Sequence, residues 1–376
     1  MSARELREHL AYWNDDVKVA AFRAALTRVV TPQSVVLDLG CGTGLLGLLA
    51  CEAGAARVYA VDAGPILSVA KELAAANGFS DRIVHINRWS TEIDLPELVD
   101  VVVADQMGGL AYDAGAFACF ADAQRFLKPG GVFIPAAFTL MLAAIESADD
   151  WSVVGGWKAR SSLDSAAMST YAANTPFNVH TTAKAALSDP AVIGHVVAGE
   201  LAPLLSRCVL EIQRPGVLHG LLGTFMATMA PGVTITNDPC APLPLRNRWR
   251  SFLPLDDQHI VGEGDLVVVD VDLRPRTQVL SWNVRIETAS GTSVQESHST
   301  FYGKFLSIDD VANMATTRRF EPTVDSRLVA AALELAQGTR TIAEVSCELA
   351  ARFPERLRTA AAAQSFVSSL SDLLAR

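Results

Sequence analysis

Residues 35–62 read VVLDLGCGTGLLGLLACEAGAARVYAVD, and the order of features in this stretch decides the fold. An apolar run at 35–39 ends in three glycines at every second position, and helical character at 45–53 leads to a second apolar run at 56–61. A buried strand, a glycine turn and a helix in this order are typical of a parallel sheet. Because the alternation continues through expected strands at 83–87 and 99–104, we predict a doubly wound, Rossmann-like α/β sheet.

The glycine turn and its acidic flanks indicate the kind of ligand. Gly40, Gly42 and Gly44 allow a tight turn and let a ligand approach bare backbone. The spacing is GxGxG rather than the dinucleotide pattern GxGxxG, and Asp38 ahead of the turn would repel a pyrophosphate but suits an ammonium group. Asp62, at the end of the second strand, can accept hydrogen bonds from ribose hydroxyls. The pattern predicts an amino acid joined to a nucleoside, with a nicotinamide dinucleotide as the alternative.

The pattern changes along the rest of the chain. Residues 5–30 are expected to form one helix ahead of the first strand, and 152–200 are polar and weakly patterned. Alternate residues are apolar in 265–274 and in 280–286, which predicts antiparallel strands. Thr341 and Glu344 form a capping-box pattern at the start of a helix. We expect a domain at 1–146, a β-rich domain at 147–318 and a helical appendage at 319–376.

The composition argues against several classes of protein. Half of the 376 residues are apolar and the net charge is −10, so large cores can form, but a basic nucleic-acid surface is not expected. The cysteines and histidines show no zinc-ligand spacing, so we expect no metal. The charged N-terminus lacks the apolar segment of a signal peptide, and the longest apolar stretch, 132–145, is too short to cross a bilayer. We therefore expect a cytoplasmic protein that binds neither nucleic acid nor membrane.

The run VLDLGCGTGLL followed by ARVYAVD resembles class I methyltransferases that use S-adenosyl-L-methionine, and more narrowly the protein arginine methyltransferases. The resemblance extends from about residue 9 to about residue 318. It implies S-adenosyl-L-methionine as cofactor, which fits the ligand expected from the glycine turn. It also implies an antiparallel β-barrel as the second domain, a dimerisation arm within 152–200, and a homodimer.

The resemblance implies cofactor-binding residues outside the glycine turn. His9 matches a histidine of the helix that covers the cofactor, and Lys18 stands where the family has an arginine that grips the cofactor carboxylate. Lysine keeps the charge but lacks the bidentate fork of arginine. Ser90 and Thr91 match the loop that contacts adenine, although a shift of one residue would put Glu92 in the place of Thr91. The full expected set is His9, Lys18, Asp38, Gly40, Gly42, Gly44, Asp62, Ser90 and Thr91.

The resemblance also implies an acceptor site built on two carboxylates. Asp105 takes the place of the family's first catalytic glutamate and Asp113 that of the second, in a hairpin that is one residue shorter. Two carboxylates can hold a planar, permanently charged guanidinium by paired hydrogen bonds. Met107 lies in the same hairpin, and Arg248 and Trp249 match the family's Thr-His-Trp turn. These three are the expected substrate-binding residues.

We expect an enzyme that methylates a nitrogen, above all an arginine guanidino nitrogen of a protein or peptide. The first alternative is a small-molecule acceptor, such as an amine or aromatic ring of a specialised pathway, which the two aspartates and Arg248 would favour. The second alternative is a regulator that binds the cofactor without catalysis. The segment 338–344 also resembles the helical part of small domains that bind leader peptides, so the appendage is expected either to deliver a peptide or simply to pack on the barrel.

Overall fold

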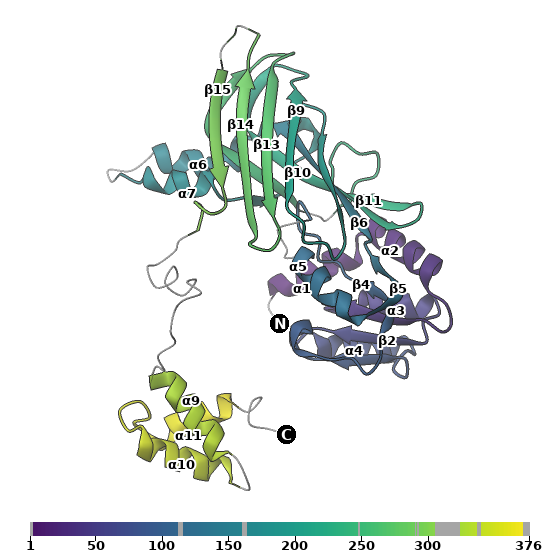
Figure 1. Ribbon diagram of the computed structural model, residues 1–376, viewed down its shortest axis with the longest axis vertical. Coiled ribbons are helices and arrows are strands. Elements are labelled where there is room, and N and C mark those ends of the chain that lie inside the picture. Colours follow the sequence, from purple (N-terminus) through teal and green to yellow (C-terminus); the bar gives the residue numbers. More distant parts are fainter. Residues whose placement is uncertain are drawn as a thin grey trace. The chain divides into compact units, whose positions relative to one another are not determined.

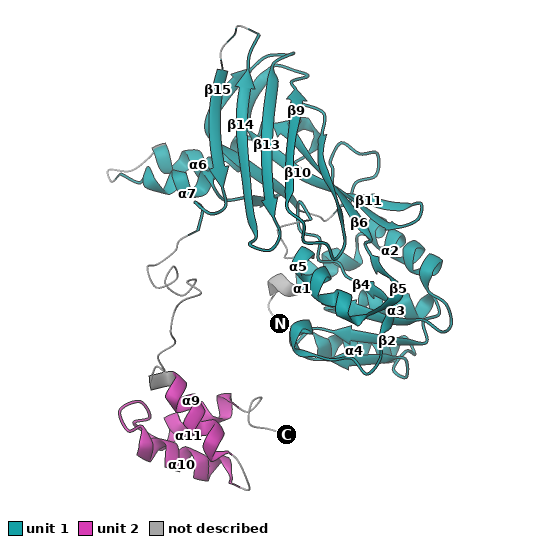
Figure 2. Cartoon of the chain, viewed as in Figure 1, with its two compact units in different colours: residues 1–305 teal, residues 306–376 magenta. Residues whose placement is uncertain are grey.

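A computed structural model describes residues 3–111, 116–159, 164–246, 249–289, 291, 293–304, 324–336 and 340–370. The chain forms two compact units, residues 1–305 and residues 306–376, and each is described by itself (Figure 2). No helix of the described residues is long and apolar enough to span a membrane.

The first part of the larger unit, which includes β2, β4 and β5 (Figure 1), is built on a five-stranded parallel sheet. The strand order is β3-β2-β1-β4-β5. Chain order reverses between β1 and β4, and such a switch point opens a crevice at the carboxyl ends of the strands. This arrangement confirms the predicted doubly wound sheet. Its strands are β1 (Val35–Leu39), β2 (Arg57–Val61), β3 (Ile83–Ile86), β4 (Val99–Val103) and β5 (Leu127–Ile134).

Helices connect the strands and precede them. Two helices occupy the segment where one was expected, because the Asp15 side chain accepts a hydrogen bond from the Lys18 backbone N–H and so caps a new helix. The helices are α1 (Ala3–Trp13), α2 (Asp16–Val29), α3 (Leu45–Glu52), α4 (Leu67–Ala76) and α5 (Ala116–Ala123), with single turns η1 (Ser90–Glu92) and η2 (Gln124–Phe126).

Two antiparallel sheets form the second part of this unit, one in the order β7-β12-β10-β6-β8 with β11 beside β10, the other in the order β15-β14-β13-β9. One continuous apolar core runs through both sheets and the parallel sheet. The strands are β6 (Ala137–Ile145), β7 (Phe177–Val179), β8 (Ala191–Val197), β9 (Leu204–Glu211), β10 (Gly216–Ala230), β11 (Val233–Thr236), β12 (Arg250–Val261), β13 (Leu266–Arg274), β14 (Val279–Glu287) and β15 (Ser293–Ser299).

The two-residue alternation predicted for β13 and β14 is confirmed. Val267, Val269, Val271 and Leu273 are buried in β13, and every second residue from Leu280 to Ile286 is buried in β14. The change from parallel to antiparallel pairing comes between β5 and β6, so β6 belongs to the antiparallel sheet although it precedes residue 147. The division at 146 and 318 stays a prediction.

The weakly patterned segment after residue 147 holds two helices, α6 (Ala148–Ala159) and α7 (Ala167–Ala173), and a short turn η3 (Ala183–Ala185) (Figure 1). The Trp151 indole N–H donates to the Leu255 carbonyl at 2.9 Å, and Lys158 Nζ donates to the Asp256 carbonyl. These contacts fix α6 to β12.

The smaller unit contains α9 (Val324–Leu335), α10 (Ile342–Arg352) and α11 (Ala360–Ser369). Its own apolar core includes Leu328, Leu335 and Leu349. The predicted capping box is confirmed, since Thr341 accepts from the Glu344 backbone N–H and Glu344 accepts from that of Thr341.

Candidate functional site

Two cavities, of about 410 and 560 Å³, lie at the carboxyl ends of the parallel strands. Gly40, Asp62 and Gln106 line both cavities, so these three residues mark the junction between them. The glycine turn has the backbone that its sequence predicts: φ is +68° at Gly40, +52° at Gly42 and +81° at Gly44. Only glycine adopts such angles without strain, so the turn exposes backbone to the cavities.

Asp62 holds the glycine turn in shape. One of its carboxylate oxygens accepts the Gly42 N–H at 2.8 Å, and the other accepts the Gly64 N–H at 2.7 Å. The Asn87 side chain donates to the backbone carbonyl of Asp62 at 2.9 Å. A carboxylate offers about four lone-pair sites. Asp62 can therefore brace the loop and still accept two hydrogen bonds from a ligand.

Asp38 lies beneath the turn rather than in it. Its side chain is completely buried, and Oδ2 accepts the Gly47 N–H at 2.7 Å, within the first turn of α3. Burial away from water raises the pKa of this carboxyl to about 7. Asp38 lines neither cavity. Its direct contact with a ligand ammonium stays a prediction, whereas its support of the turn is plain in the structure.

Helix α1 covers the turn. A Cβ placed on Gly42 would lie 3.0 Å from His9 Cε1, so the imidazole packs directly on the glycine. The Trp13 indole N–H donates to Thr43 Oγ1 at 2.9 Å. His9 and Tyr12 line the larger cavity. The expected role of His9, in a helix that covers the cofactor, stays a prediction.

Lys18 and Asp105 form an ion pair inside the larger cavity. Lys18 Nζ lies 2.7 Å from Asp105 Oδ2, and the two side chains are 4% and 18% exposed. The same ammonium lies 4.0 Å from the centroid of the Tyr12 ring. This pair joins α2 to the segment after β4, so the two residues that sequence reasoning assigned to different ligands stand side by side.

The segment after β4 is held against the antiparallel sheets. The buried Asn237 side chain donates to the carbonyls of both Gly109 and Trp249, at 2.5 and 2.9 Å. A Cβ on Gly109 would lie 2.8 Å from the Ser251 backbone nitrogen. Met107 is fully buried in the core and lines neither cavity.

Only some of the remaining residues expected in the site line one of the two cavities. Ser90 lines the smaller cavity, whereas Thr91 and Glu92 are exposed in η1 and line neither cavity. Gly44 begins α3 and packs toward Ala70. Asp113 and Arg248 lie outside the described residues.

Trp249 lines the larger cavity and is 45% exposed. Its ring stacks on His180, with centroids 3.8 Å apart at an angle of 33°. Burial, and then the charge of Arg250, lower the pKa of His180. A neutral imidazole and an indole thus form one aromatic face at the edge of the cavity.

The chain is similar in sequence to known methyltransferases. Residues 23–137 match the family model of ribosomal protein L11 methyltransferase. A probable protein arginine N-methyltransferase 6 of Arabidopsis thaliana is 35% identical over 167 residues, 43% of this chain and 38% of that protein. An arginine N(omega)-methyltransferase of Streptomyces achromogenes subsp. streptozoticus is 29% identical over 274 residues, 70% of this chain and 75% of that protein.

A chain of the Trypanosoma brucei PRMT1 enzyme–prozyme heterotetrameric complex with AdoHcy superposes with a TM-score of 0.68 at 21% identity, over 77% of this chain and 97% of that one. This likeness concerns the fold. The chain resembles class I methyltransferases and, among them, the protein arginine methyltransferases. It spans between 38% and 45% of the length of the Arabidopsis relative and three others named as arginine methyltransferases.

Two residues of this site are absent from the sequence-based expectations. Gln106 lies at the junction of the cavities, and its amide nitrogen occupies the space where Gly40 would carry a Cβ. Asn237 ties the segment after β4 to Trp249. Gln106 sits next to Asp105 and could have been found by proximity in sequence. Asn237 carries no local signal, because its partners are 128 and 12 residues away.

Proposed function

We propose that this methyltransferase transfers a methyl group from S-adenosyl-L-methionine to a guanidino nitrogen of arginine. The observation that carries the proposal is that Asp105, Asp62 and the glycine turn line one cavity. A carboxylate suited to a guanidinium thus stands in the same space as a turn suited to a nucleoside. When bound, the cofactor supplies the sulfonium methyl that is transferred.

The residues fit that cofactor. Asp62 keeps lone pairs for the ribose hydroxyls, and the bare backbone at Gly40 and Gly42 admits a close approach. His9 and Tyr12 cover the cavity from α1, and Ser90 lines its neighbour. We assign these residues, with Lys18 and Gly44, to cofactor binding.

The acceptor would be held by electrostatics rather than activated by a strong base. Asp105 is the carboxylate that orients the guanidinium, and Asp113 is its proposed partner. The Lys18 ammonium keeps the Asp105 carboxylate in a fixed place and reduces the cost of burying its charge. Holding the acceptor nitrogen toward the methyl would supply proximity. As the N–C bond formed and the S–C bond broke, the demethylated cofactor would be the leaving group and water would take the proton of the acceptor nitrogen. Trp249 offers an aromatic face to the cation.

Asp105→Asn tests the proposal. The amide keeps the size of the side chain but removes the charge that orients a cation, so turnover should fall at least about 100-fold while cofactor affinity changes little. Asp81→Asn, in an exposed loop before β3, is the matched control. Mass spectrometry of free arginine, arginine peptides and simple amines, each incubated with the cofactor, identifies the acceptor. Unchanged turnover in Asp105→Asn would favour a regulator that binds the cofactor without catalysis.

Free arginine is the second candidate acceptor. The Streptomyces relative, which aligns over 75% of its length, is named for arginine and not for a protein. A product formed from free arginine but not from any peptide in the panel would support this candidate and place the chain in a small-molecule pathway.

We further propose a homodimer that assembles through α6 and α7, a cytoplasmic location, and domains at 1–146, 147–318 and 319–376. Light scattering at micromolar concentration, cell fractionation and limited proteolysis test these three proposals in turn. Deleting residues 321–376 tests whether the helical unit recruits a peptide. A loss of peptide turnover with unchanged cofactor affinity supports recruitment, and unchanged turnover argues for a packing role.

A further inference from the structure

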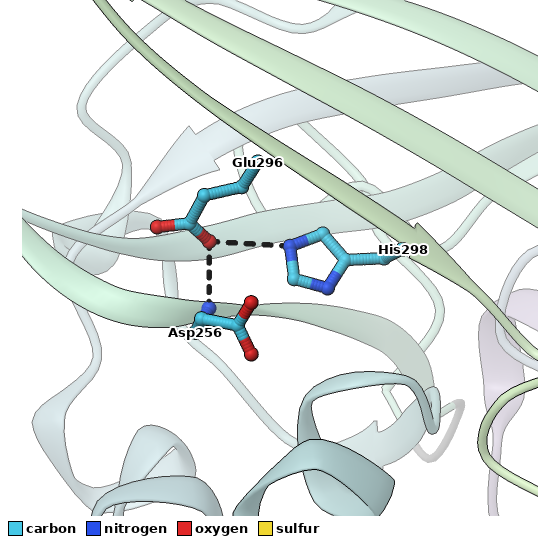
Figure 3. A group of neighbouring side chains, drawn as sticks. All are labelled: Asp256, Glu296 and His298. Carbon is cyan, nitrogen blue, oxygen red and sulfur yellow. Dashed lines mark hydrogen bonds and ion pairs between the residues drawn. The ribbon is translucent and has the colours of Figure 1, made fainter.

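A second group of chemically active side chains lies away from the methyltransferase cavities. Asp256, in β12, faces Glu296 and His298, in β15 (Figure 3). One potential ligand atom from each residue lies within 4.8 Å of the other two. The strands belong to different sheets, so the group sits where an edge strand of the four-stranded sheet meets the six-stranded sheet. None of the three residues lines either cavity of the functional site.

Glu296 is held in one orientation at the centre of the group. Its Oε2 accepts the Asp256 backbone N–H at 2.7 Å and lies 3.2 Å from His298 Nε2. His259 Nε2 contacts the other oxygen, Oε1, at 2.5 Å. Two ligands about 2.0 Å from a tetrahedral zinc ion stand about 3.3 Å apart, so an ion could replace the Glu296–His298 hydrogen bond with little change in their 3.2 Å separation.

The polar groups around Glu296 are left incompletely paired. The His298 side chain is fully buried, and its Nδ1 has no hydrogen-bond partner among the described residues. A buried nitrogen without a partner costs about 1–3 kcal/mol. The carboxylate of Asp256 likewise accepts no hydrogen bond from the part of the chain that the structure describes, although the residue is half-buried. Two carboxylates face each other here, and the imidazoles of His259 and His298 and the ammonium of Lys158 offset their charge.

We propose that Asp256, Glu296 and His298 bind a divalent transition-metal ion of the zinc type. A cation satisfies both carboxylates at once, and the mixture of imidazole and carboxylate ligands favours zinc over magnesium or calcium, which prefer oxygen ligands alone. His259 acts as a positioning residue that holds the second oxygen of Glu296. The ion joins β12 of the six-stranded sheet to β15, the edge strand of the four-stranded sheet.

The neighbouring contacts keep the site in shape. The Trp282 ring stacks on His298, with centroids 5.2 Å apart at 15°, and the Trp282 indole N–H donates to the Pro254 carbonyl. Lys158, from α6, donates to the Asp256 carbonyl and to the Asp257 carboxylate, and its charge also acts on the Asp256 carboxylate. The metal would therefore also stiffen the strand on which α6 is anchored.

Metal analysis of the full chain tests the proposal. After treatment with a chelator and reloading with Zn²⁺, the wild type should retain about one equivalent by mass spectrometry, and Asp256→Asn or His298→Gln should bind zinc at least about 100-fold more weakly. His259→Gln should weaken binding about 10- to 100-fold, as expected for a residue that orients a ligand. Asp257→Asn, a neighbour that is 70% exposed and pairs with Lys158, should bind like the wild type.

Cobalt substitution separates this site from the exposed thiols of Cys240 and Cys347. A site of imidazole and carboxylates gives visible d–d bands without thiolate charge-transfer absorption. Zinc should also raise the unfolding temperature of the wild type, and magnesium should not. The proposal is overturned if the wild type retains no stoichiometric zinc, if cobalt shows thiolate ligation, or if Asp256→Asn binds zinc as tightly as the wild type does. If His298→Gln does not fold, the zinc affinity of Asp256→Asn and the cobalt spectrum of the wild type still test whether the metal site exists.

Discussion

Asp62→Asn is expected to weaken cofactor binding almost as much as Asp62→Ala. Asparagine is usually the mild replacement for aspartate, but here both carboxylate oxygens accept backbone N–H groups, from Gly42 and Gly64. An amide has a single acceptor oxygen, so its NH₂ group would face an N–H donor. One of the two hydrogen bonds must break, and the glycine turn loses a brace.

The structure sets the size of the effect. A hydrogen bond to a charged group contributes about 1.5–3 kcal/mol, and a factor of ten in affinity corresponds to about 1.4 kcal/mol. The loss of one such bond, if the cofactor must restore the turn on binding, weakens binding about 10- to 150-fold. Loss of the negative charge near the ribose hydroxyls acts in the same direction.

Calorimetric titration with the demethylated cofactor product measures this effect directly. Asp81→Asn provides the same chemical change at the opposite end of the parallel sheet and should bind like the wild type. Circular dichroism confirms that each variant is folded. A dissociation constant for Asp62→Asn within twofold of the wild type would refute the argument that the carboxylate braces the turn.

Three further variants probe the surroundings of the turn. The Asp38 carboxyl keeps its proton in the folded state up to about pH 7, whereas its ordinary pKa is 3.8. The free energy of unfolding therefore falls as pH rises from about 4 to 7, by up to about 4 kcal/mol. Asp38→Asn should flatten that part of the pH dependence in urea unfolding, and an unchanged slope would count against it. Gly109→Ala brings a methyl group within 2.8 Å of Ser251 backbone, so it should cost about 1–3 kcal/mol of stability and lower turnover more than cofactor affinity; wild-type kinetics would contradict this. Trp249→Ala removes the ring that stacks on His180 and should raise the KM for the acceptor with no change in cofactor affinity, whereas an unchanged KM would assign Trp249 to packing alone.

The parallel sheet and the glycine turn could be predicted from the sequence because they depend on residues that are close together in the chain. The positive φ angles at Gly40, Gly42 and Gly44 follow from residues that lie within five positions of one another. The same holds for the capping box of Thr341 and Glu344 and for the alternation in β13. In each case the interacting groups are close in the chain, so spacing alone carries the information.

Contacts between residues that are far apart in the chain could not be predicted from the sequence. The assignment of Lys18 to a cofactor carboxylate stays a prediction, whereas the sequence gives no sign of its contact with Asp105, 87 residues away. The absence of zinc-ligand spacing predicts no metal, and the proposed metal site instead joins Asp256 and His298 from two different sheets. Spacing rules detect ligands that share one turn or hairpin and cannot detect such pairs.

The sequence by itself determined that a strand, a bare-backbone turn and a helix start a doubly wound sheet, because backbone angles and hydrophobic period are local properties. Only the tertiary structure decided which side chains face the cavities. It buried Asp38 and Met107, brought Lys18 to Asp105 and placed Trp249 in the lining of the same cavity. The physical reason is that burial and charge pairing depend on which distant segments pack together. The packing of the whole core determines which segments these are.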